Sequence, residues 1–299
     1  MTKIEVLTDR ARWQHACERR RVGHYAAAGY PAAAVDRLLD EERGRMADWT
    51  VAEITAAGDC VGFVAVAVRE DNGAPTGLVG DLWVSPEHAG AGHERAARDW
   101  AEEFCRAAGA VRIAVRIFGG TGPFADYGLR SQGRIRTLTE PAVVPGVTAR
   151  RMTPDEYPHW LATEQEGYVA GLLRAGGLRE VEARAKSDAD YGRLLPDGLN
   201  TANTSILVLE HEGRPVGSGW LRHDHLPGVT YGYGVRIDPG ARGRGLGRAA
   251  IAAGEAATLA AGDAALTFTV WEGNTVAMNL YTAAGYRVAH EYRSKDLAH

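Results

Sequence analysis

Apolar positions recur along the chain with two periods, which predict strands alternating with helices. Short apolar or β-branched runs bounded by Gly, Pro, Asn or Asp have the length of strands, and they lie at 61–68, 111–117, 205–211, 215–223, 229–237 and 266–270. Longer segments with helical spacing separate them, and the clearest is the alanine-rich segment 249–261. The pattern predicts a mixed fold of helices and strands rather than an all-helical or all-strand one.

The second half of the chain shows the order of its elements most clearly. After a strand at 147–152, Thr153 is an N-cap, Pro154 stands at the first helical position and Glu156 completes a capping box. Helices are expected at 154–173, ended by Gly176-Gly177, and at 178–191. Glu212-Gly213 marks a hairpin turn, and a loop containing His223-Asp224-His225 precedes the strand 229–237. The predicted order is β-α-α-β-β-β-α-β-α-β.

One unit of sequence occurs twice. Segment 81–97 aligns without gaps on 234–250, and Phe124-x-x-x-Gly128 matches Tyr281-x-x-x-Gly285. The apolar strand 61–68 is paired in this alignment with 206–209. A length of 299 residues suits two ordinary domains. We expect two tandem domains, 1–143 and 147–299, joined by a proline-containing linker at 141–146.

A glycine-rich turn follows the strand 229–237 and leads into the alanine-rich helix. It contains Gly243, Gly245 and Gly247, with arginines at 242, 244 and 248. Glycines adopt positive φ angles without strain, and the first N–H groups of a helix lack intrahelical partners, so this turn is a predicted phosphate site. A P-loop would end in Gly-Lys-Ser/Thr, and a dinucleotide-binding motif would need an acidic residue that ends a second strand; neither fits here.

A second motif lies downstream, where a strand is followed by Asn-x-x-Ala-x-x-Leu-Tyr-x-x-x-Gly-Tyr at 274–286. Together with Arg242-x-x-Gly245-x-Gly247, it resembles the acyl-CoA-binding segments of the GCN5-related N-acetyltransferase (GNAT) superfamily. The resemblance implies an α+β fold of α/β-type mixed sheet: two tandem GNAT folds, each a mostly antiparallel central sheet flanked by helices, with a splayed strand pair. It also implies direct acetyl transfer from acetyl-CoA, as co-substrate, to a small amine in a ternary complex.

The resemblance also assigns roles by position. In the family, the tyrosine phenol protonates the leaving thiolate, so Tyr281 is the expected general acid. The general base stays open, with Tyr233 and Glu272 as candidates and a relay through His223 weighed against a solvated loop. Contacts to the cofactor are expected from Val235, Arg236, Ile237, Arg242, Gly243, Arg244, Gly245, Leu246, Gly247, Arg248, Asn274, Asn279 and Tyr281. Contacts to the acceptor are expected from Glu164, Tyr168, Trp220, His223 and Tyr231.

The first copy departs from the family pattern at the positions that would carry chemistry. Ala89 stands where Arg242 stands, and Glu94 stands where Gly247 stands. A carboxylate beside a pyrophosphate is repulsive, by roughly 1–4 kcal/mol at ~4 Å. Phe124 lacks the phenol of Tyr281. We expect a degenerate, structural first copy, and a second acyl-CoA site is the alternative.

Net charge, apolar run length and cysteine content restrict the expected partners and location of the protein. The net charge of −4, with no long run of one sign, makes nucleic acid an unexpected partner. The longest apolar runs have strand length, and the first 21 residues lack an apolar signal segment, so a cytoplasmic protein without a membrane span is expected. Three scattered cysteines indicate reduced thiols and no metal site. The oligomeric state, monomer or homodimer, is left open.

Two other functions compete with an N-acetyltransferase acting on a small amine. One is an acyltransferase of thiol or antibiotic metabolism, similar to the mycothiol synthases, which are also tandem GNAT proteins. The other is a non-catalytic acyl-CoA sensor or scaffold, which the departures in the first copy make conceivable.

Overall fold

A computed structural model describes residues 2–71, 73–140, 146–175 and 178–297. The predicted linker at 141–145 and the predicted helix end at Gly176-Gly177 lie outside the described residues. The first half contains β1 (Thr2–Val6), α1 (Ala11–Ala28), α2 (Ala32–Met46), β2 (Thr50–Ala56), β3 (Asp59–Asp71), β4 (Ala74–Val84), α3 (His93–Ala107), β5 (Arg112–Ile117) and β6 (Gly128–Thr137).

The second half repeats this order and adds one helix before its last strand. It contains β7 (Thr148–Arg151), α4 (Tyr157–Ala175), α5 (Glu180–Leu194), β8 (Thr204–His211), β9 (Arg214–Leu226), β10 (Val229–Ile237), α6 (Leu246–Ala260), β11 (Ala265–Trp271), α7 (Thr275–Ala283) and β12 (Arg287–Asp296). The order predicted for this half is therefore confirmed. In the first half, the 3-10 turn Gly122–Phe124 stands where α7 stands in the second.

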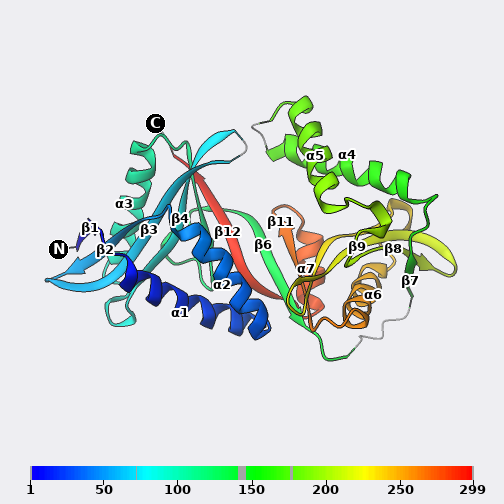
Figure 1. Ribbon diagram of the computed structural model, residues 1–299, viewed down its shortest axis with the longest axis horizontal. Coiled ribbons are helices and arrows are strands. Elements are labelled where there is room, and N and C mark those ends of the chain that lie inside the picture. Colours follow the sequence, from blue (N-terminus) through cyan, green and yellow to red (C-terminus); the bar gives the residue numbers. More distant parts are fainter. Residues whose placement is uncertain (1, 72, 141–145, 176–177, 298–299) are drawn as a thin grey trace.

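All twelve strands form one continuous, mostly antiparallel sheet, in the order β1-β2-β3-β4-β5-β12-β6-β11-β10-β9-β8-β7 (Figure 1). The last strand of each half is exchanged. Strand β12 pairs antiparallel with β5 and β6, and β6 pairs antiparallel with β12 and β11. The α+β class is confirmed, but the two expected sheets are joined into one. Side chains of β6 and β12 consequently reach the cavities of the opposite half.

A splayed strand pair is present in both halves, as the resemblance implied. Strands β10 and β11 pair in parallel only from Val229↔Ala265 to Tyr231↔Thr267, and β4 and β5 pair only over Thr76–Val79. Each splay begins beside a β-bulge. The extra residue is Tyr233 in β10 and Gly80 in β4. Bulges re-aim side chains and end pairing, and they are common beside active sites.

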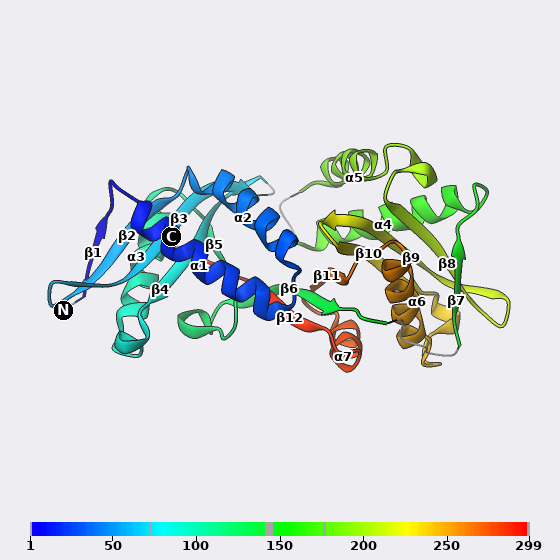
Figure 2. The ribbon, with the colours of Figure 1, turned by 60° about the horizontal axis from the view of Figure 1, so that its bottom comes forward.

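Helices cover both faces of the sheet in the second half, with α4 and α5 on one side and α6 and α7 on the other (Figure 2). The apolar run 206–209 of β8 follows from this arrangement. Ile206 and Val208 pack with Trp160 of α4, whereas Leu207 and Leu209 pack in the clusters under α6. A strand covered on both faces needs no polar alternation, so its sequence is continuously hydrophobic.

Two expectations about β9 were wrong. His223-Asp224-His225 was expected in a loop, but β9 extends to Leu226, which pairs with Val229 across a turn at 227–228. In the repeated order of elements, 61–68 of β3 is also equivalent to part of β9, rather than to 206–209 of β8. Gly62 and Gly217 hold the same position, since a Cβ on either would lie within 2.2 Å of a carbonyl oxygen on the next strand. Among the described helices, none combines the length and apolar character needed to cross a membrane.

Candidate functional site

The glycine-rich turn before α6 presents free space at a helix start. Gly243 and Gly245 have φ angles of +75° and +78°, and Gly245 is the N-cap of α6 with no side chain bonded to it. A Cβ on Gly243 or Gly245 would meet nothing within 4 Å. Arg242, Arg244 and Arg248 are exposed around the turn. Such a turn can hold a phosphate or a diphosphate.

Two residues of the predicted loop also support the fold. Leu246 is buried in a cluster with Leu209 and Ala250. A Cβ on Gly247 would lie 2.9 Å from Cδ2 of Leu280, so this glycine lets α7 approach α6 closely. At these two positions, the groups available to a ligand are the backbone amides.

A narrow cavity of about 80 Å³, named here the splay cavity, runs from this helix into the gap between β10 and β11. Tyr281 lines it, and its ring centroid lies 4.0 Å from that of Phe268. Burial raises the pKa of Tyr281 to about 12, so the phenol keeps its proton at neutral pH. Gly234 and Val235 of β10 form the facing wall.

A larger cavity of about 550 Å³ lies on the α4–α5 side of the sheet. We name it the aromatic cavity because seven aromatic side chains line it: Tyr168, Tyr191, Trp220, Tyr231, Tyr233, Trp271 and Tyr292. Trp220 stacks on Tyr233 at 4.4 Å between ring centroids. Tyr233 and Thr269 line both cavities, so the two cavities approach each other at the bulge of β10.

One carboxylate of the aromatic cavity stands beside the bulge. Oε2 of Glu164 is 3.7 Å from the position a Cβ would take on Gly234. Burial raises the pKa of Glu164, and Arg236, whose Nε lies 3.7 Å from Oε1, opposes the rise. The Tyr168 hydroxyl instead donates to Oδ2 of Asp190 at 2.8 Å. The buried Nε1 of Trp220 has no partner among the described residues, so it is available to a ligand.

Besides Arg236, Ile237 and the turn at 242–248, four further residues expected in the site line neither cavity. Asn274 caps α7, with Oδ1 accepting from the Ala277 N–H at 3.2 Å. Asn279 and Glu272 are exposed. His223 is buried and bonded to Ser205 and Thr230 at 2.8 and 3.0 Å, and burial lowers its pKa. The geometry thus separates these side chains from the place where the cavities meet.

Other lining residues were not expected from the sequence. Arg130 and Ser131 come from β6 and Tyr292 from β12, the exchanged strands. No local pattern signals which sheet position an exchanged strand will take. Asp190 and Arg193 come from α5, a helix that the resemblance places at the acceptor pocket, so its polar face was the available signal.

The equivalent groups of the first half are engaged by the protein's own side chains. Oε1 of Glu94 accepts from the Gly90 N–H at 3.2 Å, in the loop that corresponds to 243–247. Arg21 donates to the carbonyl oxygen of Gly80 at the bulge. Oδ2 of Asp81 accepts from Nε1 of Trp13 at 2.9 Å. Across the described parts of both halves, no group of three or more His, Cys, Asp or Glu side chains could hold a metal ion.

Comparison with known proteins matches residues 10–118 and 178–286 to the model of the acetyltransferase (GNAT) family. The chain is 29% identical over 276 residues to a mycothiol acetyltransferase of Sanguibacter keddieii, covering 84% of this chain and 81% of that protein. It is 24% identical to the uncharacterised N-acetyltransferase YdgE of Bacillus subtilis, over 50% of this chain and 98% of that protein. A GCN5-related N-acetyltransferase from Sphaerobacter thermophilus has a similar fold, with TM-score 0.59, 18% identity and coverage of 100% and 96%.

Proposed function

This chain belongs to the acetyltransferase (GNAT) family, and we propose that its second half transfers an acetyl group from acetyl-CoA directly to a small amine. The observation that carries the proposal is the junction of two cavities at Tyr233 and Thr269, with an open glycine-rich helix start at the far end of one of them. In the first half the corresponding groups are taken by Glu94, Arg21 and Asp81. We therefore assign that half a structural role in acyl transfer.

The cofactor is proposed to follow the path from α6 to Tyr281. Its diphosphate binds the amides at 243–248 and the exposed arginines around them. Its slender pantetheine arm lies along Gly234 and Val235 in the splay cavity, whose narrow volume excludes a bulkier group. An N–H of β10 polarises the thioester carbonyl.

The amine is proposed to lie in the aromatic cavity. Ring faces and the carboxylate of Glu164 attract a cationic amine into it. Glu164 takes the ammonium proton and passes it to solvent, and the neutral nitrogen attacks the thioester carbon. The C–S bond then breaks, the thiolate receives the Tyr281 proton, and the second proton lost by the nitrogen as the amide forms returns through water to the Tyr281 phenolate. Glu164 suits the role of base because its pKa is raised and it stands beside Gly234. Tyr233 suits it less because burial raises its own pKa, and Glu272 is outside the lining.

The name of the Sanguibacter relative supports a second candidate function. This candidate is an acetyltransferase of mycothiol metabolism, and its support is the 29% identity over most of both chains. The two candidates share the cofactor site and differ in the acceptor. Turnover with an acceptor of mycothiol metabolism, compared with a panel of simple amines, distinguishes them.

Calorimetry with acetyl-CoA tests the proposal, using two matched variants. Gly245→Glu puts a carboxylate at the N-cap of α6, and Gly92→Glu does the same at the equivalent N-cap of α3. We expect Gly245→Glu to abolish binding and Gly92→Glu to leave it unchanged, because one loop holds the diphosphate and the other does not. Binding lost only with Gly92→Glu, or no binding by the unaltered protein, would contradict the assignment. Acetyl-CoA binding with no CoA release from any acceptor would favour the sensor.

A further inference from the structure

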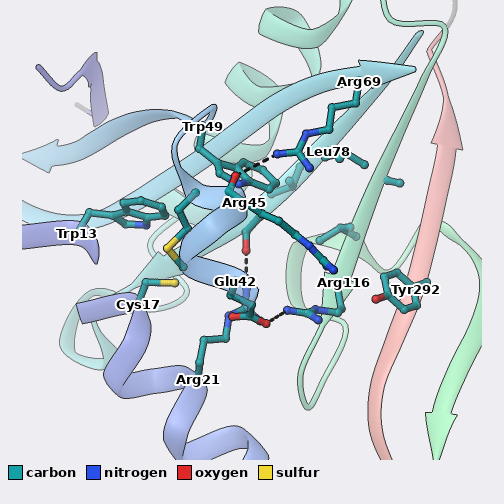
Figure 3. Close-up of a pocket in the computed structure, with 15 residues that line it drawn as sticks. Trp13, Cys17, Arg21, Glu42, Arg45, Trp49, Arg69, Leu78, Arg116 and Tyr292 are labelled. Atoms are coloured by element: carbon teal, nitrogen blue, oxygen red, sulfur yellow. Dashed lines mark hydrogen bonds and ion pairs between the residues drawn. The ribbon is translucent and has the colours of Figure 1, made fainter. Parts of the chain in front are cut away.

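The first half has a cavity that corresponds to the aromatic cavity but has different chemistry. It lies between α1, α2 and the strands β4, β5 and β12, and it encloses about 190 Å³ (Figure 3). Four arginines line it, Arg21, Arg45, Arg69 and Arg116, against the single carboxylate of Glu42. We name it the arginine cavity. The aromatic cavity, by contrast, balances Arg130 and Arg193 against Glu164 and Asp190.

Two of these arginines are committed to Glu42. Arg116 bonds Oε1 of Glu42, and Nε of Arg21 lies 3.7 Å from Oε2. The Tyr25 hydroxyl also donates to Glu42, at 2.5 Å. The single carboxylate of Glu42 therefore faces two guanidinium groups, so these three side chains together carry one net positive charge.

Arg45 and Arg69 are not neutralised in this way. Nη2 of Arg69 donates to the Arg45 carbonyl oxygen at 3.0 Å, and its nearest carboxylate is Asp48, at 3.8 Å and largely exposed. The Arg45 guanidinium has no hydrogen bond or ion pair with the described residues. In Figure 3 it extends along the cavity toward Arg116 and Tyr292.

Part of the cavity lining is apolar. Trp13, Met46, Trp49 and Leu78 form it. The Trp49 ring lies directly against Gly80, where a Cβ would come within 2.5 Å of the ring. The Arg69 guanidinium carbon is 5.7 Å from the centroid of that ring. An apolar body can therefore lie on the tryptophan while its charged end reaches the arginines.

We propose that the arginine cavity binds a small organic anion, a carboxylate attached to a flat apolar body. Guanidinium groups bind carboxylates through paired, charge-assisted hydrogen bonds. The N–H donors of the Arg45 guanidinium bond none of the described residues, so they are available to such a ligand. A cationic amine is excluded by the same charges. The cavity volume limits the ligand to roughly the size of one or two aromatic rings. This site is separate from the acyl-transfer site of the second half and does not depend on it.

Calorimetric titration of the full chain with benzoate tests this assignment, with benzylamine as the cationic probe of equal shape. We expect benzoate to bind and Arg45→Gln to weaken it at least ~10-fold, since one charge-assisted hydrogen bond is worth about that factor. Arg45 is exposed on α2, so its replacement should leave the thermal midpoint unchanged. Arg19→Gln, an exposed charge on α1, is the matched control and should leave the benzoate affinity unchanged.

A further variant separates this site from the glycine-rich loop, which is also cationic. Gly245→Glu should leave benzoate binding unchanged while it abolishes acetyl-CoA binding. The proposal is overturned if benzoate does not bind, if benzylamine competes for the same site, or if Arg19→Gln weakens binding as much as Arg45→Gln. It is also overturned if Gly245→Glu removes benzoate binding, because the anion would then occupy the loop.

Discussion

The two halves share one fold and differ in what fills it. Each has a parallel strand pair that splays, a bulge beside the splay, and a glycine turn leading into a helix. Neither α6 nor α3 has a side-chain cap at its start, and a cavity lies at the splay of each half. In the first half, Glu94 bonds the turn and Arg21 bonds the bulge. The same fold therefore carries different side-chain contacts at its turn and at its bulge.

The difference has a simple electrostatic cause. A helix start favours negative charge, and a carboxylate tethered four residues from Gly90 is present at high effective concentration. An external diphosphate must displace it and then bear its repulsion. The cavities on the helix-pair side also differ in charge, because four arginines and one carboxylate line that of the first half, whereas two of each line that of the second.

The largest expected effect on the comparison is Glu164→Gln. Loss of the base should lower kcat about 100-fold, with little change in acetyl-CoA affinity. Glu166→Gln, an exposed carboxylate on the same helix, is the control. The base works when deprotonated, so activity is present above the pKa of Glu164 and lost as pH falls through it. Because burial raises this pKa, the loss should begin at a higher pH than for an ordinary carboxyl.

The measurement is a pH–rate profile of kcat in both proteins. The profile of Glu164→Gln should lack the acidic limb that the unaltered protein shows. An unchanged acidic limb would assign the base elsewhere.

Tyr281→Phe is expected to have the next largest effect. Turnover should fall at least ~10-fold while acetyl-CoA affinity is retained, because the phenol donates a proton only to the leaving thiolate. Phe124→Tyr, which restores a phenol at the equivalent position of the first half, should change neither quantity. Steady-state kinetics measures the turnover, and calorimetry measures the acetyl-CoA affinity. Unchanged turnover in Tyr281→Phe would show that Tyr281 is not the general acid.

Glu94→Gly tests whether the loop carboxylate alone prevents the first half from binding acetyl-CoA. Calorimetry should still give one acetyl-CoA per chain, because Arg21 keeps its bond to the Gly80 carbonyl oxygen and Asp81 adds a carboxylate next to this bulge. A glycine in the first turn of α3 should cost about 1 kcal/mol of unfolding free energy, read from urea denaturation. A second acetyl-CoA bound per chain would show that the loop carboxylate alone separates the halves.

The smallest effect is expected from Asn274→Ala. Loss of the cap on α7, which the 3-10 turn of the first half does not need, should lower the unfolding free energy by about 1 kcal/mol. Asn274→Asp keeps an accepting oxygen and should restore most of it. Equal urea midpoints for the alanine and asparagine proteins would show that the cap contributes nothing.

Local sequence determined much of this molecule. The order of elements in the second half, the Glu212-Gly213 turn with both residues at positive φ, and the Asn274 cap all depend on neighbours in the chain. The glycine-rich loop was found because short-range geometry fixes how a strand enters a helix, whereas Tyr281 was identified from the resemblance of 274–286 to the GNAT family. Even so, the loop expected around His223 was wrong, because pairing with β10 extends β9 beyond it.

Tertiary structure alone decided the rest. Strands β6 and β12 carry no pattern that states which neighbours they will pair with, since a strand satisfies its backbone equally well beside either half. Their exchange brings Arg130 and Tyr292 into the aromatic cavity. Glu164 meets Gly234, seventy residues away, only because α4 packs across the bulge. Periodicity reports which side of an element is buried, whereas the partner it is buried against depends on contacts that no local stretch encodes.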